Sequence, residues 1–358
     1  MIAAPNTKQI SIPYLLKIGN GKIARIGKYL YDKEMMKIAV FMGKNTANLI
    51  EPRFSETLNR YKIEIAEQKS VESIDLDAIA HSAFALPSGL DAIVGIGGGK
   101  ALDAAKYTAF LLQKPYICAP TILSNDGFCS PGSSLLVQGK RVSARSKMPF
   151  GIVIDLDIIK VSPANYLYSG VGDMVSKITA LLDWKEAFNR GYEHFSDFAS
   201  MLAYNSLDLL FLKHSYDIYA TEFQRSLASS LTTSGIAMEV AGSSRPASGS
   251  EHLISHALDS VSAKPKLHGV QVAIASYLCA LLQNNPNTHL LREILEKIGF
   301  WEFAASDPIA KKEFIAALGL APSIKRDYYT ILSEKDSFER ALVLIENDET
   351  LKRVIVDG

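Results

Sequence analysis

The sequence has few cysteines, and their arrangement excludes one class of protein. The chain of 358 residues contains three, Cys118, Cys129 and Cys279. An odd number at wide spacing argues against a disulfide framework and for a reducing compartment. We therefore expect these cysteines to be small buried side chains.

The chain also lacks an excess of either charge and lacks a long hydrophobic run. Lys plus Arg and Asp plus Glu number 38 each, so no global field favours nucleic acid, an anionic membrane surface or another polyanion. The N-terminus shows no basic segment followed by an apolar one, as a secretion signal would. The most apolar later stretch, Val270–Leu282, is shorter than the ~20 residues of a membrane span. We expect a cytoplasmic protein without a membrane or nucleic-acid partner, and a homo-oligomer.

Hydrophobic residues, in contrast, are plentiful. They make up 48% of the chain, which is enough for the cores of two domains. The first 160 residues alternate β-rich runs with helical patterns, which is typical of a parallel sheet with crossover helices. The predicted strands are Lys37–Gly43, Tyr61–Ala66, Asp91–Gly97, Pro115–Pro120 and Phe150–Leu156. The segment SSLLVQGKRVSARS predicts a hairpin that turns at Gln138-Gly139-Lys140, at the edge of this sheet.

Beyond Asp157 the pattern becomes helical, after the cap and first-turn signal Ser162-Pro163. The fold class predicted is therefore α/β plus all-α. Residues 1–160 would form a Rossmann-like parallel-sheet domain and residues 161–358 an α-helical domain. With no internal repeat or long linker, we expect ligands in a cleft between the two.

A glycine-rich turn follows one predicted strand, in DAIVGIGGGKALDAAKYTAFLL. Gly97, Gly98 and Gly99 remove every Cβ where the backbone enters a helix, so an anion such as a pyrophosphate can approach the helix amides. The alternative is a tight turn without a ligand. Two named motifs are excluded, because the dinucleotide fingerprint needs Gly at Lys100 and a Walker A loop needs Ser or Thr at Ala101.

A second polar loop, PTILSNDGFCSPGSS, follows the next strand, where open parallel sheets bind ligands. Thr121, Ser124 and Ser130 could bind a nucleotide, and Asp126 a substrate hydroxyl. An ordinary polar loop is the alternative.

Three of the seven histidines cluster in SRPASGSEHLISHALDSVSAKPKLHGVQ. On a helix, His252 and His256 share one face and could both reach one metal ion, and His268 follows shortly after. Asp173, in SGVGDMVSK, is the candidate carboxylate ligand. Spacing alone leaves open whether these histidines are structural or ligands, and which two of the three would bind the ion. The other four, His81, His194, His214 and His289, are expected on the surface.

Taken together, these segments resemble the sn-glycerol-1-phosphate dehydrogenases, within the superfamily of iron-type alcohol dehydrogenases, glycerol dehydrogenases and dehydroquinate synthases. The matching segments are GIGGGKALDAAKY, PTILSNDGFCSP, SGVGDMVSKITALLDW, SSRPASGSEHLISHALD and LHGVQV, which span about residues 91 to 275 in the family's order. The first 90 and last 80 residues match in general character alone.

The resemblance implies a dehydroquinate-synthase-like fold and a role for each motif. Residues 1–160 would be the dinucleotide-binding domain and residues 161–358 the metal- and substrate-binding domain. The metal ligands would be Asp173, His252 and His268, and the substrate would contact Asp126, Asp173 and His256. The catalytic residues would be Asp173 and the three clustered histidines. The NAD or NADP cofactor would contact Gly97, Gly98, Gly99, Lys100, Ala101, Thr121, Ile122, Leu123, Ser124 and Ser130.

The sequence departs from the family pattern at three positions. Lys100 stands where Ser or Thr is common, Asn125 where His is frequent, and Val270 where Glu often follows the His-Gly pair. None of these changes removes a ligand. Lys100 could alter phosphate binding or could be a solvated side chain. The residues that bind the substrate phosphate are not assigned among Arg245, Lys264, Lys266 and Lys177.

The function implied is interconversion of dihydroxyacetone phosphate and sn-glycerol 1-phosphate, a phosphorylated polyol, by hydride transfer in a metal-dependent, NAD(P)-linked dehydrogenase. One carboxylate and two imidazoles suit Zn²⁺, with Ni²⁺ or Fe²⁺ as alternatives. The strand Lys37–Met42 is followed by Gly43-Lys44-Asn45-Thr46 without a carboxylate, so use of both NAD and NADP is predicted. Competing hypotheses are a dehydrogenase of unphosphorylated glycerol or another polyol, a dehydroquinate-synthase-like lyase, and a catalytically silent binding protein.

Overall fold

The computed structural model describes residues 9–211 and 216–357, and the chain divides into two compact units. The first unit contains the residues up to 17, 22–120 and 127–153. The second contains 18–21, 121–126 and the chain from 154 onwards. His214 lies outside the described residues.

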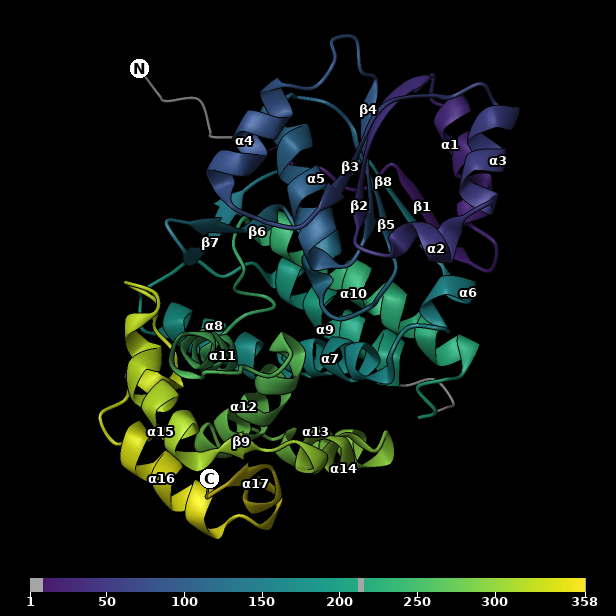
Figure 1. Cartoon of the computed structure of the whole chain (residues 1–358). Coiled ribbons are helices and arrows are strands. Elements are labelled where there is room, and N and C mark those ends of the chain that lie inside the picture. Colours follow the sequence, from purple (N-terminus) through teal and green to yellow (C-terminus); the bar gives the residue numbers. More distant parts are fainter. Residues whose placement is uncertain (1–8, 212–215, 358) are drawn as a thin grey trace, which may run out of the picture. The chain divides into compact units, whose positions relative to one another are not determined.

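The first unit is built on a six-stranded sheet with the order β1-β8-β5-β4-β2-β3. The neighbours from β8 to β3 pair in parallel. Every residue of β4, β5 and β8 is buried, as expected for parallel strands covered on both faces. Figure 1 shows the strands between α4 and α5 on one side and α1 and α3 on the other. The strands are β1 (Leu15–Gly19), β2 (Lys37–Gly43), β3 (Glu64–Val71), β4 (Ala92–Gly97), β5 (Tyr116–Pro120) and β8 (Gly151–Asp155).

Short helices connect these strands, as the crossover pattern predicts. They are η1 (Ile23–Arg25), α1 (Ile26–Tyr31), α2 (Thr46–Ile50), α3 (Arg53–Arg60), α4 (Leu76–Phe84), α5 (Gly99–Leu111) and η2 (Asp126–Cys129). The predicted parallel-sheet class is confirmed, and β2 has the predicted bounds. The predicted strand Tyr61–Ala66 starts too early, because Tyr61 caps α3 and Lys62 has a positive φ of 55°. The edge strand β1 was not predicted.

The predicted hairpin is present but does not extend the sheet. β6 (Gly132–Val137) and β7 (Lys140–Arg145) pair antiparallel and form a separate two-stranded sheet. Gln138 and Gly139 both have positive φ, 50° and 75°, which a two-residue hairpin turn of type I′ requires. The hairpin contacts the chain just after the edge strand β3, where the N–H of Leu136 donates to the carbonyl of Ile74 at 2.9 Å. β6 also packs on α4 and α5, where Leu135 is fully buried.

The second unit is predominantly helical, which confirms the predicted class of the C-terminal half. Its central helix α12 is buried along nearly its whole length and packs against α7 and α11. The helices are α6 (Leu156–Ile159), α7 (Ala164–Val175), α8 (Lys177–Asn189), α9 (Asp197–Phe211), α10 (Thr221–Ala241), α11 (Ser250–Val261), α12 (His268–Leu282), α13 (Thr288–Lys297), α14 (Phe300–Ser306), α15 (Lys311–Leu320), η3 (Ala321–Ser323), η4 (Ile331–Ser333), α16 (Ser337–Asn347) and α17 (Glu349–Val354). Two short strands, β9 (Ile309–Ala310) and β10 (Ile355–Val356), pair in parallel.

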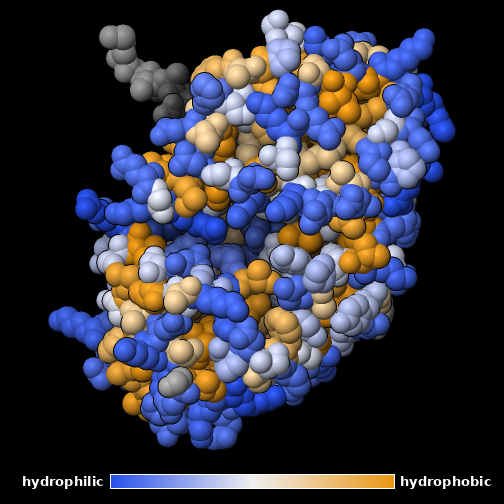
Figure 2. Space-filling view, viewed as in Figure 1, coloured by the Kyte–Doolittle hydropathy of each residue, from blue (hydrophilic) through white to orange (hydrophobic). Residues whose placement is uncertain are grey.

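The apolar residues Val270–Leu282 thus form part of a core helix. Among the described helices, none combines the length and the hydrophobicity that crossing a membrane would take. The three cysteines are buried and are not joined in disulfides, as expected. On the face shown in Figure 2, hydrophobic side chains alternate with hydrophilic ones.

Candidate active site

Three side chains from three helices of the second unit converge on one point. Asp173 near the end of α7, His252 in α11 and His268 at the start of α12 each offer a ligand atom, and these atoms lie within 4.8 Å of one another. Nε2 of His252 is 3.5 Å from Oδ1 of Asp173, and Nε2 of His268 is 3.8 Å from the same oxygen. Ligands ~2.1 Å from a tetrahedral zinc ion are roughly 3.4 Å apart. The spacing therefore fits one ion.

Two glycines allow the helices to approach closely enough for this convergence. A Cβ on Gly172 would lie 1.9 Å from the carbonyl oxygen of Gly269, and one on Gly269 would lie 1.8 Å from that of Ser169. Any larger residue would push α7 and α12 apart. Because Gly172 precedes Asp173 and Gly269 follows His268, this crossing fixes two of the three candidate ligands.

The same principle places α11 and the loop of residues 121–126. A Cβ on Gly249 would meet Cα of Ala180 at 2.9 Å, and the N–H of Ser250 donates to Asp183 at 2.7 Å, so α11 begins against α8. A Cβ on Gly170 would lie 2.1 Å from the carbonyl oxygen of Leu123. The loop therefore runs directly over α7.

The two imidazoles are oriented by hydrogen bonds at their other ring nitrogen. Nδ1 of His252 lies 2.9 Å from Oε1 of Glu251, and Nδ1 of His268 lies 3.1 Å from Oγ of Ser255. Glu251 is fully buried and also accepts from Thr179 at 2.8 Å. Because Nδ1 faces the carboxylate of Glu251, Nε2 of His252 is directed at Asp173 and can present its lone pair to an ion bound there, which is the usual arrangement of metal-binding histidines.

The site holds more buried negative than positive charge. Three carboxylates, Asp126, Asp173 and Glu251, surround the single ammonium of Lys177, and each of the four residues is at most 9% exposed. These groups leave two excess negative charges, which a divalent cation would neutralise. This charge balance, together with the donor set, fits a bound dication.

Electrostatics inside the cluster distinguish its two aspartates. Burial alone would raise the pKa of Asp173, but Lys177 and the hydrogen bond from His252 together bring that pKa below its usual value. For Asp126, burial and the charge of Asp173 raise the pKa, against the opposing effect of Lys177. Asp173 is therefore the more firmly ionised carboxylate, as a metal ligand must be.

His256 lies one helical turn after His252, as the spacing predicted. Its ring centroid is 6.4 Å from that of His252 and 5.7 Å from that of His268, whereas the rings of His252 and His268 are 5.0 Å apart. His256 is partly exposed beside the cluster. The structure thus places it next to the three converging atoms and not among them.

In the first unit, the glycine-rich turn joins β4 to α5. Gly97 ends β4 with a φ of 143°. A Cβ added to Gly97 would lie 3.0 Å from the backbone nitrogen of Gly43. Gly98 is the N-cap of α5, and a Cβ on Gly99 would meet nothing within 4 Å. Space is open beside the first-turn amides, while Ala101 is buried and Lys100 is exposed.

The remaining expected cofactor residues are divided between the units, since Thr121, Ile122, Leu123 and Ser124 belong to the second and Ser130 to the first. The carbonyl oxygen of Ser124 accepts a hydrogen bond from Oγ of Ser169 at 2.9 Å. Leu123 is fully buried and Thr121 nearly so.

Ser130 is held by a lysine that sequence reasoning missed. Nζ of Lys106 donates to the carbonyls of Gly127 at 2.6 Å and Gly132 at 2.7 Å and lies 3.4 Å from Oγ of Ser130. Lys106 is 1% exposed and flanks Ala104 and Ala105 on the buried side of α5. A charged residue at a buried helical position was the signal. Ser234, discussed below, had no comparable signal.

Of the four basic candidates for the substrate phosphate, three are engaged elsewhere. The guanidinium of Arg245 pairs with Glu193, donates to the carbonyl of Tyr329 at 2.8 Å and stacks on Tyr328. Lys266 pairs with Asp307, and Lys177 is enclosed by the two aspartates of the cluster. Lys264 is exposed.

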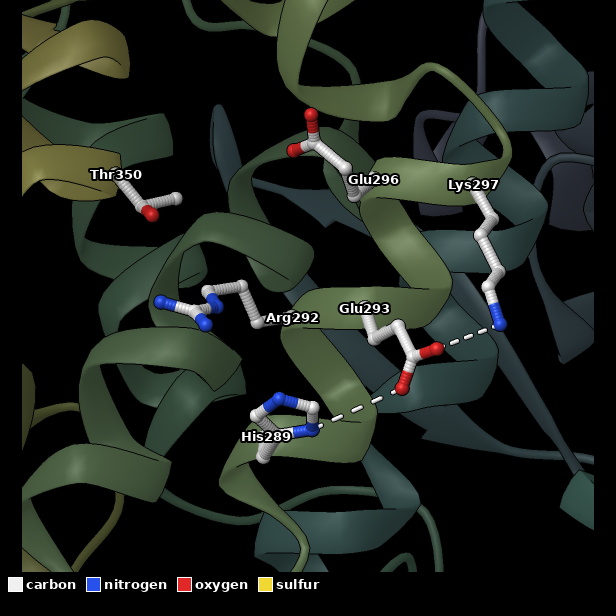
Figure 3. A pocket seen from close by; sticks show the side chains of 6 residues that line it. All are labelled: His289, Arg292, Glu293, Glu296, Lys297 and Thr350. Atoms are coloured by element: carbon white, nitrogen blue, oxygen red, sulfur yellow. Dashed lines mark ion pairs between the residues drawn. The ribbon is translucent and has the colours of Figure 1, made fainter.

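The histidines expected on the surface are there: His81, His194 and His289 are exposed. Figure 3 shows His289 in a hollow with Arg292, Glu293, Glu296 and Lys297 of α13 and with Thr350 of α17. Glu293 pairs with Lys297 at 2.6 Å and with His289 at 3.7 Å on the same helix. Such exposed pairs are typical of a solvated helix surface.

Comparison with known proteins identifies relatives of this chain. A family model described as iron-containing alcohol dehydrogenase matches residues 17–163. Glycerol-1-phosphate dehydrogenase [NAD(P)+] from Metallosphaera sedula is 34% identical, covering 91% of this chain and 93% of that protein. The protein of the same name from Thermococcus sibiricus is 38% identical, covering 70% and 73%.

Solved structures show the same fold at lower identity. Glycerol dehydrogenase from Schizosaccharomyces pombe superimposes with a TM-score of 0.77 at 20% identity, covering 95% of this chain and 90% of that one. A probable glycerol dehydrogenase from Sinorhizobium meliloti gives 0.74 at 18% identity, covering 95% and 99%. With more than 90% of its length aligned at 34% identity to a named relative, this chain belongs to the glycerol-1-phosphate dehydrogenase family.

Proposed function

We propose that the protein is a metal-dependent, NAD(P)-linked dehydrogenase that interconverts dihydroxyacetone phosphate and sn-glycerol 1-phosphate. The observation that carries this proposal is the convergence of Oδ1 of Asp173 with Nε2 of His252 and His268. The name shared by relatives 32–38% identical to this chain supports the phosphorylated substrate. We do not favour the unphosphorylated polyol, lyase or silent-protein alternatives.

Asp173, His252 and His268 would hold the ion, and Zn²⁺ suits this donor set, with Ni²⁺ or Fe²⁺ as alternatives. A divalent ion bound there supplies Lewis-acid polarisation at C2 of the substrate, and the nicotinamide supplies or accepts the hydride. Glu251 and Ser255 keep both Nε2 atoms directed at the ion. Lys177 offsets the charge of Asp173.

The substrate would be oriented by residues beside the three ligands. Asp126 would accept a hydrogen bond from the primary hydroxyl next to C2. His256 would donate to the substrate or relay a proton, because its ring lies beside the candidate ligands, with its centroid 5.7 Å from that of His268. Asp173 would touch the substrate as well as the ion.

The first unit would bind the dinucleotide and the second the metal and substrate, with boundaries near residue 160. The pyrophosphate of the cofactor would lie against Gly97, Gly98, Gly99, Lys100 and Ala101, where open space faces the first-turn amides of α5. The loop residues Thr121, Ile122, Leu123, Ser124 and Ser130 would contact the rest of the cofactor.

Both NADH and NADPH should serve as cofactors. The turn after β2 carries Lys44, which is exposed, and Asn45 in place of the acidic residue that binds a ribose 2′-hydroxyl in NAD-specific enzymes. We expect kcat/KM values within about tenfold for the two cofactors. A strong preference for NADH would contradict this assignment.

We also propose a cytoplasmic homo-oligomer. Supporting the oligomer, Phe198, Met201 and Tyr204 are about half exposed at three-residue spacing along α9. Light scattering that gives a monomer mass at micromolar concentration would refute it.

The test of the function follows oxidation of NADH or NADPH with dihydroxyacetone phosphate or dihydroxyacetone, and reduction of NAD⁺ with glycerol, each with and without a chelator. We expect turnover of the phosphorylated ketone that is lost with the chelator and restored by Zn²⁺. Equal kcat/KM for dihydroxyacetone and its phosphate would favour the unphosphorylated alternative. Undiminished activity after complete metal removal would refute the metal site.

A further inference from the structure

The two carboxylate oxygens of Asp126 have different surroundings. Oδ2 accepts from Oγ of Ser234 at 2.6 Å and from Nζ of Lys177 at 3.2 Å. None of the hydrogen bonds among the described residues ends on Oδ1. The side chain keeps 13% of its surface accessible. One oxygen is thus held by the protein and the other remains available to a ligand.

The backbone of Asp126 is fixed as well. Its N–H donates to Oδ2 of Asp173 at 2.9 Å, while Oδ1 of Asp173 faces the two histidines. Lys177 is fully buried and donates to the carbonyl of Asp173 at 2.7 Å as well as to Asp126. The acceptor oxygen of Asp126 therefore has a fixed position relative to the candidate metal ligands.

Ser234 differs from its neighbours on α10 in the use of its hydroxyl. Thr232 and Thr233 donate to the carbonyls of Ala228 and Ser229, one turn earlier in their own helix. This is the ordinary pattern for a hydroxyl inside a helix. Ser234, which is fully buried, instead donates across to a side chain of a separate loop, 108 residues away in sequence.

We infer that Ser234 and Lys177 are positioning residues that fix Asp126 so that Oδ1 selects substrates with a primary hydroxyl next to the reacting carbon. This inference rests on the proposed function and deepens it. An acceptor held on one oxygen cannot rotate away when a ligand lacks the hydroxyl, so such a ligand leaves a desolvated carboxylate oxygen unpaired. The site then rejects it by the cost of that unpaired acceptor.

The experiment compares Ser234→Ala with the wild type on two ligands that differ by one hydroxyl. Dihydroxyacetone phosphate carries the hydroxyl, and hydroxyacetone phosphate has a methyl group in place of the hydroxymethyl group. We expect the variant to lose roughly tenfold or more in kcat/KM for dihydroxyacetone phosphate, and less than about twofold for hydroxyacetone phosphate. If the second compound is not reduced, its inhibition constant against the first is compared instead.

Ser230→Ala is the matched control. Ser230 lies one turn earlier on α10, is equally buried, and its Oγ has no hydrogen-bond partner. We expect this variant to have the same kcat/KM as the wild type for both compounds. Zinc content and the KM for NADPH should match the wild type in both variants, because neither serine forms a hydrogen bond with a candidate metal ligand.

A double variant tests whether Ser234 acts through Asp126. Asp126→Ala should lower kcat/KM for dihydroxyacetone phosphate, and adding Ser234→Ala should then have no further effect. Equal losses on the two ligands, or full additivity in the double variant, would overturn the inference. If the wild type reduces dihydroxyacetone but not its phosphate, the proposed phosphate substrate fails. The same comparison with dihydroxyacetone and hydroxyacetone then decides the role of Ser234.

Discussion

The glycine-rich turn at residues 97–99 and the helix crossing at Gly172 and Gly269 both depend on missing side chains, but they use the space differently. Beside Gly99 the space stays open. At the crossing, backbone carbonyls lie where Cβ atoms would be. The first arrangement leaves helix amides accessible to an anion, and the second brings ligand side chains together. A glycine therefore indicates a binding surface only where nothing packs against it.

The largest loss of activity is expected on replacing Asp173, the candidate metal ligand at the crossing of α7 and α12. Asp173→Ala removes the only carboxylate among the three converging groups and leaves Lys177 without one of its partners. We expect loss of bound zinc and a fall in kcat of about a thousandfold or more. Metal analysis and steady-state kinetics measure both. A variant that retains metal and normal turnover would refute the ligand assignment.

Gly269→Ala should break the crossing without touching a ligand. Its Cβ would meet the carbonyl of Ser169 at 1.8 Å, a backbone atom that cannot move aside. We expect a destabilisation of about 3 kcal/mol or more and weaker zinc binding, as α12 and His268 are displaced. Chemical denaturation and zinc titration test this. An unchanged free energy of unfolding would show that the crossing tolerates a methyl group.

Glu251→Gln tests the hydrogen bond that orients His252. The amide keeps the volume of the side chain but gives Nδ1 a weaker acceptor. We expect zinc affinity to fall about 10- to 100-fold, measured by competition with a chelator. Thr179→Ala would remove the hydrogen bond to the other carboxylate oxygen of Glu251 and should lower zinc affinity less. Wild-type affinity in Glu251→Gln would show that the carboxylate has no orienting role.

Gly99→Ala is the counterpart of Gly269→Ala at the open turn. Its methyl group would meet nothing within 4 Å, and alanine is the better helix former, so the free energy of unfolding should stay equal or rise slightly. We expect the KM for NADPH to rise about tenfold, since the methyl occupies the space needed by the phosphates. An unchanged KM would favour a tight turn without a ligand.

The smallest effect concerns a cation outside the candidate site. Burial, and secondarily Arg245, lower the pKa of Lys325 from 10.5 to about 8. Between pH 8 and 10.5 the unfolded chain binds a proton that the folded chain has released. Stability therefore rises with pH across that window, and the cost of the charged amine is fully present below pH 8.

Lys325→Met should remove this cost while keeping contact with the Tyr328 ring, over which Nζ now lies at 4.4 Å. We expect about 1 kcal/mol of added stability at pH 7 and a flatter pH dependence between 8 and 10.5, by denaturant unfolding at several pH values. A variant with the same slope as the wild type would show that Lys325 is not the group responsible.

Part of the candidate site could be predicted because its signals are local. His252 and His256 share a helical face whenever α11 forms, and the turn of Gly97, Gly98 and Gly99 follows from a buried strand meeting a helix. Spacing could not choose between His256 and His268, which are both near His252 in sequence. The close approach at Gly269 settles which pair faces Asp173, since it brings α12 against α7.

Other features had no local signal. The hairpin β6–β7 was predicted with its turn, yet its packing on α4 and α5 depends on where Leu135 finds apolar partners. Ser234 resembles any serine in a helix rich in Ser and Thr, and its bond to Asp126 joins segments 108 residues apart.

The local pattern of residues was enough to predict the elements: a buried parallel sheet in the first half, helices in the second, and the residue types able to hold phosphate and metal. Periodicity and turn chemistry act over a few residues, so they can be read along the chain. Which side chains meet, and which atoms they present, depends on the packing of the whole chain. Contacts such as Asp173 with His268, or Ser234 with Asp126, depend on helix crossings that no short stretch of sequence encodes.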